Sequence, residues 1–211
     1  MDKLQAAMER ILVPIAAKIN AQRHVASVRD AFTLVFPLTM AGSMVVLINN
    51  VFLSPEGFVA SLFHLGELIP NLTDYQAILN SVVNGTTNIM ALLIAFLTAY
   101  ELAGHLKGDK TLAGITSLSA YFILYPGAKE FADGSTGLTN TYFGAQGLFV
   151  ALIFGLITAE LLVRLGNNKK LQIKMPDMVP PAVSRSFNLL FPIMIVLALM
   201  GILSYLFSLV T

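Results

Sequence analysis

Five long stretches that carry almost no charge constrain this chain more than any other feature. An α-helix rises 1.5 Å per residue, so about 20 apolar residues cross a hydrocarbon core of roughly 30 Å. The chain is therefore predicted to be an all-α integral membrane protein with five transmembrane helices. The third stretch is short, so it crosses with little tilt, thins the bilayer locally or re-enters. The stretches cover residues 31–53, 80–100, 111–126, 143–163 and 187–210.

The composition agrees with a lipid environment and excludes several functions. Charged residues make up 12% of the chain and hydrophobic residues 56%, whereas a soluble domain carries roughly 25% charged residues. The 13 basic and 12 acidic residues give a net charge of +1, so no nucleic-acid partner is predicted. Cysteine is absent, which excludes disulfides, thiolate metal sites and cysteine nucleophiles.

Lysine and arginine alternate between the two sides of the predicted membrane. Five precede the first stretch, the four connections hold none, two, one and five, and none follows the last stretch. Basic residues accumulate on the cytoplasmic side of a membrane. If all five stretches cross the lipid bilayer, twelve of the 13 basic residues lie on one side. The N-terminus is therefore predicted to be cytoplasmic and the C-terminus of this chain extracytoplasmic.

Residues 1–29 are predicted to form an amphipathic helix in the cytoplasmic interface, ahead of a five-span membrane domain over residues 30–211. The basic residues of this segment fall on the opposite, polar face of the helix, as they do in interfacial helices. A soluble helix that covers cytoplasmic loops of its own protein is the alternative, and Pro14 would kink either helix. The apolar face combines spacings of three, four and one: Leu4, Met8, Ile11, Leu12, Ile15 and Ile19.

Asparagines inside the stretches form a polar layer. Asn80, Asn84 and Asn88 recur every four residues, and Asn49 and Asn50 lie near the end of the first stretch. Asn49 and Asn84 each lie about 6 Å below the outer boundary, so they can meet. One interpretation is that the amides cross-link the first two helices. The other is that Asn84 and Asn88 face a wet cavity and bind sugar hydroxyls; the spacing does not decide between them.

The fourth stretch carries two further signals. Small residues recur every four positions and predict a groove that another helix approaches closely, either within one subunit or across a dimer interface. Glu160 lies near the cytoplasmic end with Arg164 four residues later, which favours a structural ion pair over a proton relay. The groove residues are Gly147, Ala151, Gly155 and Ala159.

Constellations typical of soluble enzymes are absent from the sequence. His24, His64 and His105 are far apart and have no metal-chelating spacing. The patterns GxGxxG, GxxxxGK[ST] and GxSxG do not occur. No catalytic residue, metal site or cofactor is therefore predicted.

Residues 176–187 read PDMVPPAVSRSF. This run resembles the PxxVPPAVxxSF segment of the membrane-spanning IIC component of the bacterial sugar phosphotransferase system. The amphipathic start, followed by RDAF at 29–32 and FPL at 36–38, looks like the N-terminus of that family's lactose, cellobiose and diacetylchitobiose branch. The resemblance covers essentially the whole chain.

The resemblance implies a function and also a departure from the family. Members resemble a ten-span protein about twice as long, whose N-terminal half mediates dimerisation and whose C-terminal half bears the sugar pocket and the essential His and Glu. This sequence ends after the fifth predicted span, and no residue matches the motif that carries that His and Glu. The chain is thus similar to the N-terminal interface half only.

The chain resembles part of a phosphotransferase system in the bacterial cell membrane. The resemblance implies that the complete system couples uptake of a disaccharide, such as cellobiose or diacetylchitobiose, to phosphorylation of that sugar. A IIB phosphocarrier, with IIA upstream, donates the phosphoryl group. The chain is expected to form a homodimer and to lack sugar uptake and catalysis when alone, which leaves its enzyme status open. The alternative is a standalone five-span scaffold or receptor surface without transport. A small pore is disfavoured because the inner half of the second stretch is apolar apart from Thr98.

Overall fold

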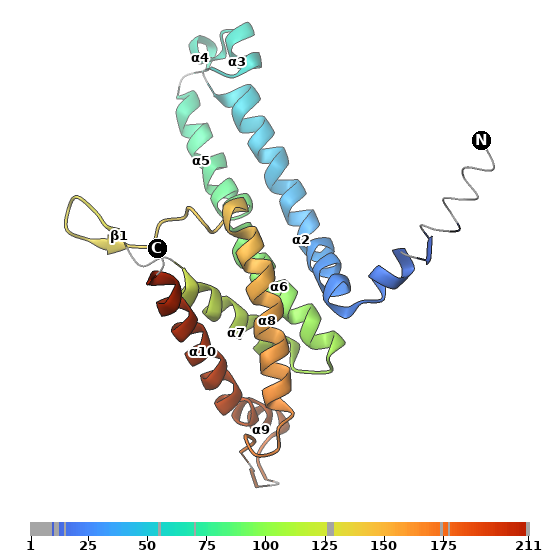
Figure 1. Cartoon of the computed structure of the whole chain (residues 1–211). Helices are drawn as coiled ribbons and strands as arrows, with labels where there is room; N and C mark the ends of the chain where they lie inside the picture. Colours follow the sequence, from blue (N-terminus) through green and yellow to red (C-terminus); the bar gives the residue numbers. More distant parts are fainter. Residues whose placement is uncertain are drawn as a thin grey trace. The chain divides into compact units, whose positions relative to one another are not determined.

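The structure is a computed structural model that describes residues 10, 13–14, 16–54, 56–69, 71–125, 129–173, 175–176 and 178–209. Within these ranges the chain is helical apart from one short hairpin and the connecting turns (Figure 1). Its contacts divide it into two compact units. The first comprises Met1–Phe32, Ala95–Tyr125 and Leu152–Thr211, and the second Thr33–Ile94 and Pro126–Ala151.

The first unit is a helical bundle with a core of small and branched apolar residues. Helix α7 packs against α10. Alanines at 0% exposure let the helix backbones approach closely, as small residues do in membrane helices. The buried core contains Ala99, Leu102, Ala103, Ala113, Ala159, Leu162, Val163 and Val196. The unit contains α7 (Lys110–Leu124), α9 (Pro181–Asn188), α10 (Leu190–Ser208) and parts of α2 (Arg23–Ile48), α6 (Met90–His105) and α8 (Leu148–Gly166).

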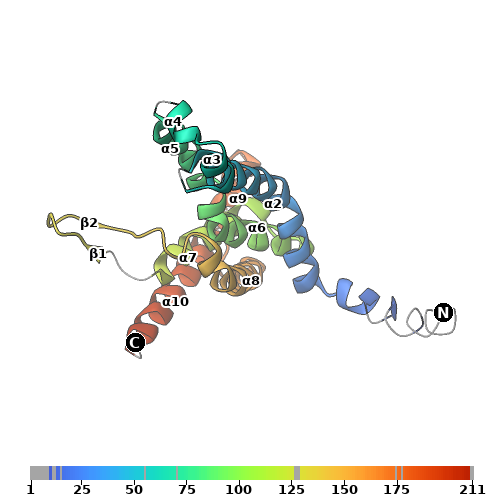
Figure 2. The ribbon, with the colours of Figure 1, turned by 90° about the horizontal axis from the view of Figure 1, so that it is seen from above.

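The second unit is built on the remainder of α2 and on α5. Two short helices, α3 and α4, lie at one end of α5 in both views (Figures 1 and 2). Helix α2 continues into a π-helical turn, and a 3₁₀ turn separates α5 from α6. The elements are η1 (Asn49–Leu53), α3 (Phe58–Leu62), α4 (Leu65–Leu68), α5 (Leu72–Asn84), η2 (Thr87–Ile89), β1 (Lys129–Glu130), β2 (Thr136–Gly137) and η3 (Ala145–Gly147).

Four helical segments of the described chain are long and apolar enough to span a membrane. They contain most of the first, second, fourth and fifth predicted stretches, so the multi-pass membrane architecture is confirmed. The third stretch corresponds to a shorter apolar helix of 15 residues, Lys110–Leu124, and its crossing stays a prediction. The four segments are Arg23–Leu62, Leu72–His105, Ala145–Gly166 and Leu190–Ser208.

The predicted amphipathic helix falls largely outside the described residues. Residues 1–9, 11, 12 and 15 are among those not described, and they include five of the six residues of its apolar face. Residues 16–20 are helical and exposed, with Ile19 among them. The helical state of 16–20 agrees with the prediction, and an interfacial position stays a prediction.

The second membrane segment is interrupted, which the sequence pattern did not predict. Helix α5 ends at Asn84, and the 3₁₀ turn η2 precedes α6. Glycine has a low helix propensity, and Gly85 caps α5. The Thr86 hydroxyl donates to the Val82 carbonyl at 2.7 Å, and the Ala91 N–H donates to the Phe143 carbonyl at 2.7 Å. These bonds satisfy polar groups at the break, as an apolar environment requires.

The hairpin is a second feature that the all-α prediction lacked. Strands β1 and β2 pair in antiparallel fashion, with Lys129 opposite Gly137. Gly134 has a φ of 79° in the turn. The Asp133 carboxylate accepts bonds from the Ser135 N–H at 3.0 Å and the Ser135 hydroxyl at 2.6 Å. Asp-Gly is a common turn dipeptide, so the signal was present in the sequence.

Candidate functional site

The asparagine layer does join the first two predicted spans. The Asn49 side-chain amide donates to the Asn80 Oδ1 atom at 2.7 Å, which confirms cross-linking. The partner is Asn80 rather than Asn84, because the depth argument assumed regular helices, whereas Asn49 begins a π-helical turn. The Asn88 amide donates to Asn84 Oδ1 at 2.6 Å across the break between α5 and α6. Sugar binding by Asn84 and Asn88 stays a prediction.

The small-residue face of the fourth span is buried within one chain. Ala151 and Ala159 have no exposed surface, and Gly147 and Gly155 are also buried. A Cβ atom at Gly155 would stand 3.1 Å from Thr98 Cβ and 3.2 Å from a backbone oxygen of α6. At Gly155 this face therefore packs closely against α6, which accounts for its small residues by helix packing.

Glu160 pairs with Arg164 as predicted and has two further basic neighbours. The Arg164 guanidinium lies 2.6 Å from Glu160 Oε1. Arg23 Nη2 lies 3.8 Å from the same oxygen, and His24 Nε2 lies 3.4 Å from Glu160 Oε2. The Glu160 side chain is 16% exposed. The cluster ties the start of α2 to the end of α8, and sequence spacing could identify only the Arg164 contact.

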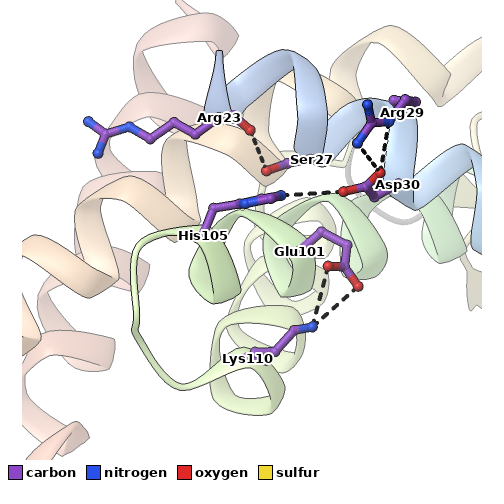
Figure 3. Close-up of polar contacts among 7 residues, drawn as sticks. All are labelled: Arg23, Ser27, Arg29, Asp30, Glu101, His105 and Lys110. Atoms are coloured by element: carbon purple, nitrogen blue, oxygen red, sulfur yellow. Dashed lines mark hydrogen bonds and ion pairs between the residues drawn. The ribbon is translucent and has the colours of Figure 1, made fainter. Parts of the chain in front are cut away.

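A second set of polar contacts, two of them ion pairs, joins α2, α6 and α7 (Figure 3). The Arg29 guanidinium lies 2.8 Å from Asp30 Oδ1, and His105 Nε2 lies 3.3 Å from Asp30 Oδ2. The Lys110 ammonium lies 3.3 Å from a Glu101 carboxylate oxygen. Exposed pairs of this kind contribute only about 0–1 kcal/mol each. Their effect is to align three helix ends rather than to supply much stability.

Each of these carboxylates has a basic partner. Asp30, Glu101 and Glu160 form ion pairs with Arg29, Lys110 and Arg164, respectively. In the part of the chain that the structure describes, no group of three His, Asp or Glu residues could hold a metal ion. The arrangement is that of helix ends fixed by ion pairs.

A hollow of about 660 Å³ opens beside these helix ends. The turn between α6 and α7, the end of α8 and helix α9 surround it. Arg185 Nη1 lies 3.5 Å from Asp109 Oδ2 across it. The Asp109 side chain also accepts a bond from the Leu112 N–H at 2.9 Å and so caps α7. Pro181, Ser184 and Arg185, from the PDMVPPAVSRSF run, line this hollow.

Comparisons with known proteins agree with that run. Residues 29–211 match the family described as "Phosphotransferase system, EIIC". The chain is 36% identical over 203 residues to the cellobiose-specific EIIC component of the phosphotransferase system of Geobacillus stearothermophilus, covering 91% of this chain and 43% of that protein. It is 35% identical over 201 residues to the lichenan permease IIC component of Bacillus subtilis (strain 168), covering 91% and 42%.

A solved structure is similar as well. The transporter ChbC, the IIC component from the N,N'-diacetylchitobiose-specific phosphotransferase system, matches with a TM-score of 0.76 and 34% sequence identity. The match covers 95% of this chain and 46% of that chain. The chain thus spans less than half the length of these relatives.

Proposed function

The chain belongs to the EIIC family of the sugar phosphotransferase system. We propose that it is the N-terminal frame, meaning the dimer-forming structural half, of a transporter that couples disaccharide uptake to phosphorylation. The observation that carries this proposal is the match over nearly the whole chain to IIC components that are about twice as long. Cellobiose and diacetylchitobiose are the proposed substrate types, because the names of the relatives state them.

The contacts support a structural role within the transporter. The first unit has a closely packed alanine-rich core and helix ends fixed by ion pairs. Asp30, Glu101 and Glu160 are each paired with an arginine or lysine side chain, which fits a structural role. We infer that this chain alone neither phosphorylates nor concentrates sugar, and that a IIB phosphocarrier, supplied by IIA, acts on the complete transporter.

Five crossings are proposed over residues 30–211, with residues 1–29 in the cytoplasmic interface. Support for the third crossing comes from the hollow, which is lined by the turn after α6 and by the end of α8. Both helices therefore run toward the same side. The chain between Lys107 and Leu148 must then return across the membrane, and α7, about 22 Å long at 1.5 Å per residue, provides most of that path.

A cytoplasmic location of the N-terminus is supported by the ion pairs at the end of the first unit where the hollow lies. Arg23 contacts Glu160 and Arg185 contacts Asp109, so three segments predicted to be cytoplasmic meet there. Basic residues on that side favour a cytoplasmic location. The C-terminus of this chain is then extracytoplasmic in the bacterial cell membrane.

A homodimer is proposed as well. The small-residue face of α8 is buried within one chain, so exposed apolar faces are better suited to subunit contact. Helix α5 presents Tyr75, Ile78 and Val82 at spacings of three and four, and all three are exposed. The mass of the chain in detergent, measured by light scattering with correction for bound detergent, tests this: a dimer is expected, and a monomer at all concentrations would contradict it.

A chimera tests the frame proposal. This chain replaces the aligned segment of the Geobacillus stearothermophilus cellobiose-specific EIIC component, and uptake is measured in proteoliposomes with phosphoenolpyruvate and the soluble carriers. We expect the chimera to transport cellobiose, and the 211-residue chain alone to transport nothing. Uptake by the chain alone would refute the proposal. A chimera that inserts and folds but never transports would also count against it.

A further inference from the structure

The hollow beside α9 has a cationic rim. Among the described residues that line it, the cations are Lys107 and Arg185 and the carboxylate is Asp109, so the net charge of this described lining is positive. Uncharged polar groups complete the rim. The polar lining also includes Ser184, Asn167 and Asn188; of the apolar residues, Leu162 and Val163 belong to the buried core, at 1% and 7% exposure, and Leu189 is partly exposed.

Lys107 occupies a backbone position that normally favours glycine. Its φ is 59°, in the left-handed region. The Gly108 N–H donates to the Ala103 carbonyl at 2.8 Å and the Lys107 N–H to the Gly104 carbonyl at 3.0 Å, which is the bonding pattern of a Schellman motif at the end of α6. Glycine follows at 108 because a Cβ there would collide with Val163 Cγ2. A lysine at 107 thus costs some local stability and places an ammonium group at the hollow.

Arg185 is held at the hollow while leaving much of its side chain available. Its side chain is 68% exposed, and its contact with Asp109 is 3.5 Å long. Asp109 is only 13% exposed, because its carboxylate caps α7. Asp109 therefore positions the guanidinium without neutralising the rim as a whole.

We propose that this hollow binds the phosphate headgroup of an anionic phospholipid. Basic pockets between membrane helices on the cytoplasmic side bind such headgroups, so this inference rests on the cytoplasmic location proposed above for this end of the first unit. A volume of about 660 Å³ lies in the range of small-ligand sites, roughly 300–1,000 Å³. The hollow lies where the apolar segment Ala145–Gly166 ends and the segment Leu190–Ser208 begins, since Gly166 and Leu189 both line it. The ends of membrane-spanning segments lie at the depth of the lipid headgroups, so a phospholipid reaches this position with its acyl chains in the bilayer and is favoured over a water-soluble phosphate ester.

Binding to the purified 211-residue chain in an uncharged detergent tests the proposal. The probes are dioctanoyl phosphatidylglycerol, dioctanoyl phosphatidylcholine and glycerol 3-phosphate, with Kd measured by thermophoresis and bound lipid counted by native mass spectrometry. We expect phosphatidylglycerol to bind more tightly than either of the others. Tighter or equal binding of glycerol 3-phosphate would assign the site to soluble phosphate esters, and equal binding of the two lipids would show no anion selectivity; either result overturns the proposal.

Lys107→Gly separates binding from structure. Glycine suits the left-handed position, so the thermal stability of the ligand-free variant is expected to stay the same or rise. The Kd for phosphatidylglycerol is expected to weaken about fivefold, since a basic residue near a membrane surface is worth about 1 kcal/mol. An unchanged Kd in a folded variant would refute a role for Lys107 in binding.

Lys169→Gly is the matched control, because Lys169 is exposed on the same predicted side and does not line the hollow. It should bind phosphatidylglycerol like the unmodified chain. An equal loss in both variants would mean general surface attraction and would overturn the site. Retained lipid binding in Lys107→Gly together with lost binding of a phosphorylated IIB carrier would instead assign the hollow to that protein.

Discussion

Gly42→Ala tests whether the close approach of α2 to the helix break holds the second unit together. A Cβ at Gly42 would lie 2.6 Å from Thr86 Oγ1 and 2.7 Å from Thr87 Oγ1, closer than ordinary contact. The Thr86 hydroxyl is fixed by its bond to Val82, so it cannot turn away without losing that bond.

The expected change in the free energy of unfolding of Gly42→Ala is the difference between two opposing effects. Overpacking costs about 1–3 kcal/mol, and alanine is better than glycine in a helix by about 1 kcal/mol. Gly42→Ala should therefore lower the free energy of unfolding by about 1 kcal/mol. A Cβ at Gly201 in α10 would meet no heavy atom within 4 Å, so Gly201→Ala should raise the free energy of unfolding by about 0.5–1 kcal/mol.

Unfolding by SDS in mixed micelles, followed by circular dichroism, measures both variants; the chain contains no tryptophan, which makes fluorescence a poor probe. Combining Gly42→Ala with Thr86→Ala and Thr87→Ala should recover part of the loss, because the two clashing hydroxyls are gone. Equal effects of the two glycine substitutions, or no recovery in the triple variant, would refute the packing argument.

Three further substitutions test single contacts. Asn80→Leu should lower the free energy of unfolding by about 1 kcal/mol, because the buried Asn49 amide loses its partner; the SDS assay measures this. Ser117→Ala should cost about 0.6–1.7 kcal/mol in the same assay, since the Ser117 hydroxyl donates to a backbone carbonyl of α6 at 2.8 Å. The hydrogen bonds from Ser135 lower the pKa of Asp133, so the carboxylate favours the ordered hairpin at neutral pH and this effect is lost as the pH falls through that pKa. Ser135→Ala should raise the pKa toward its ordinary value in an NMR titration, and an unchanged pKa would contradict this assignment.

The membrane architecture could be predicted from the sequence because charge is excluded so consistently from the spans. Hydropathy does not report backbone regularity, however. The stretch 80–100 was predicted as one helix, although the structure breaks it at η2. Gly85 and the two threonines after it were visible signals, but glycine and threonine also occur in unbroken membrane helices.

Side-chain partners were predictable only where they are close in sequence. The Glu160–Arg164 pair follows from a spacing of four residues. The contacts of Glu160 with Arg23 and His24 join residues more than a hundred positions apart, and no local pattern encodes them. The spacing of Gly155 likewise predicted a close helix contact but could not name α6 as the neighbour.

The hollow illustrates why sites of this kind escape a sequence search. Its rim comes from two connections that are far apart in the sequence: Lys107 lies in the turn after α6, whereas Asn167 and Arg185 lie between α8 and α10. Read along the sequence, Lys107 and Arg185 are simply basic residues on the predicted cytoplasmic side. Only the fold shows that Lys107 takes a left-handed conformation that glycine would adopt at lower cost. A residue that is unfavourable locally and charged at a cavity is better explained by a ligand than by orientation in the membrane, because any exposed lysine nearby would serve orientation equally well.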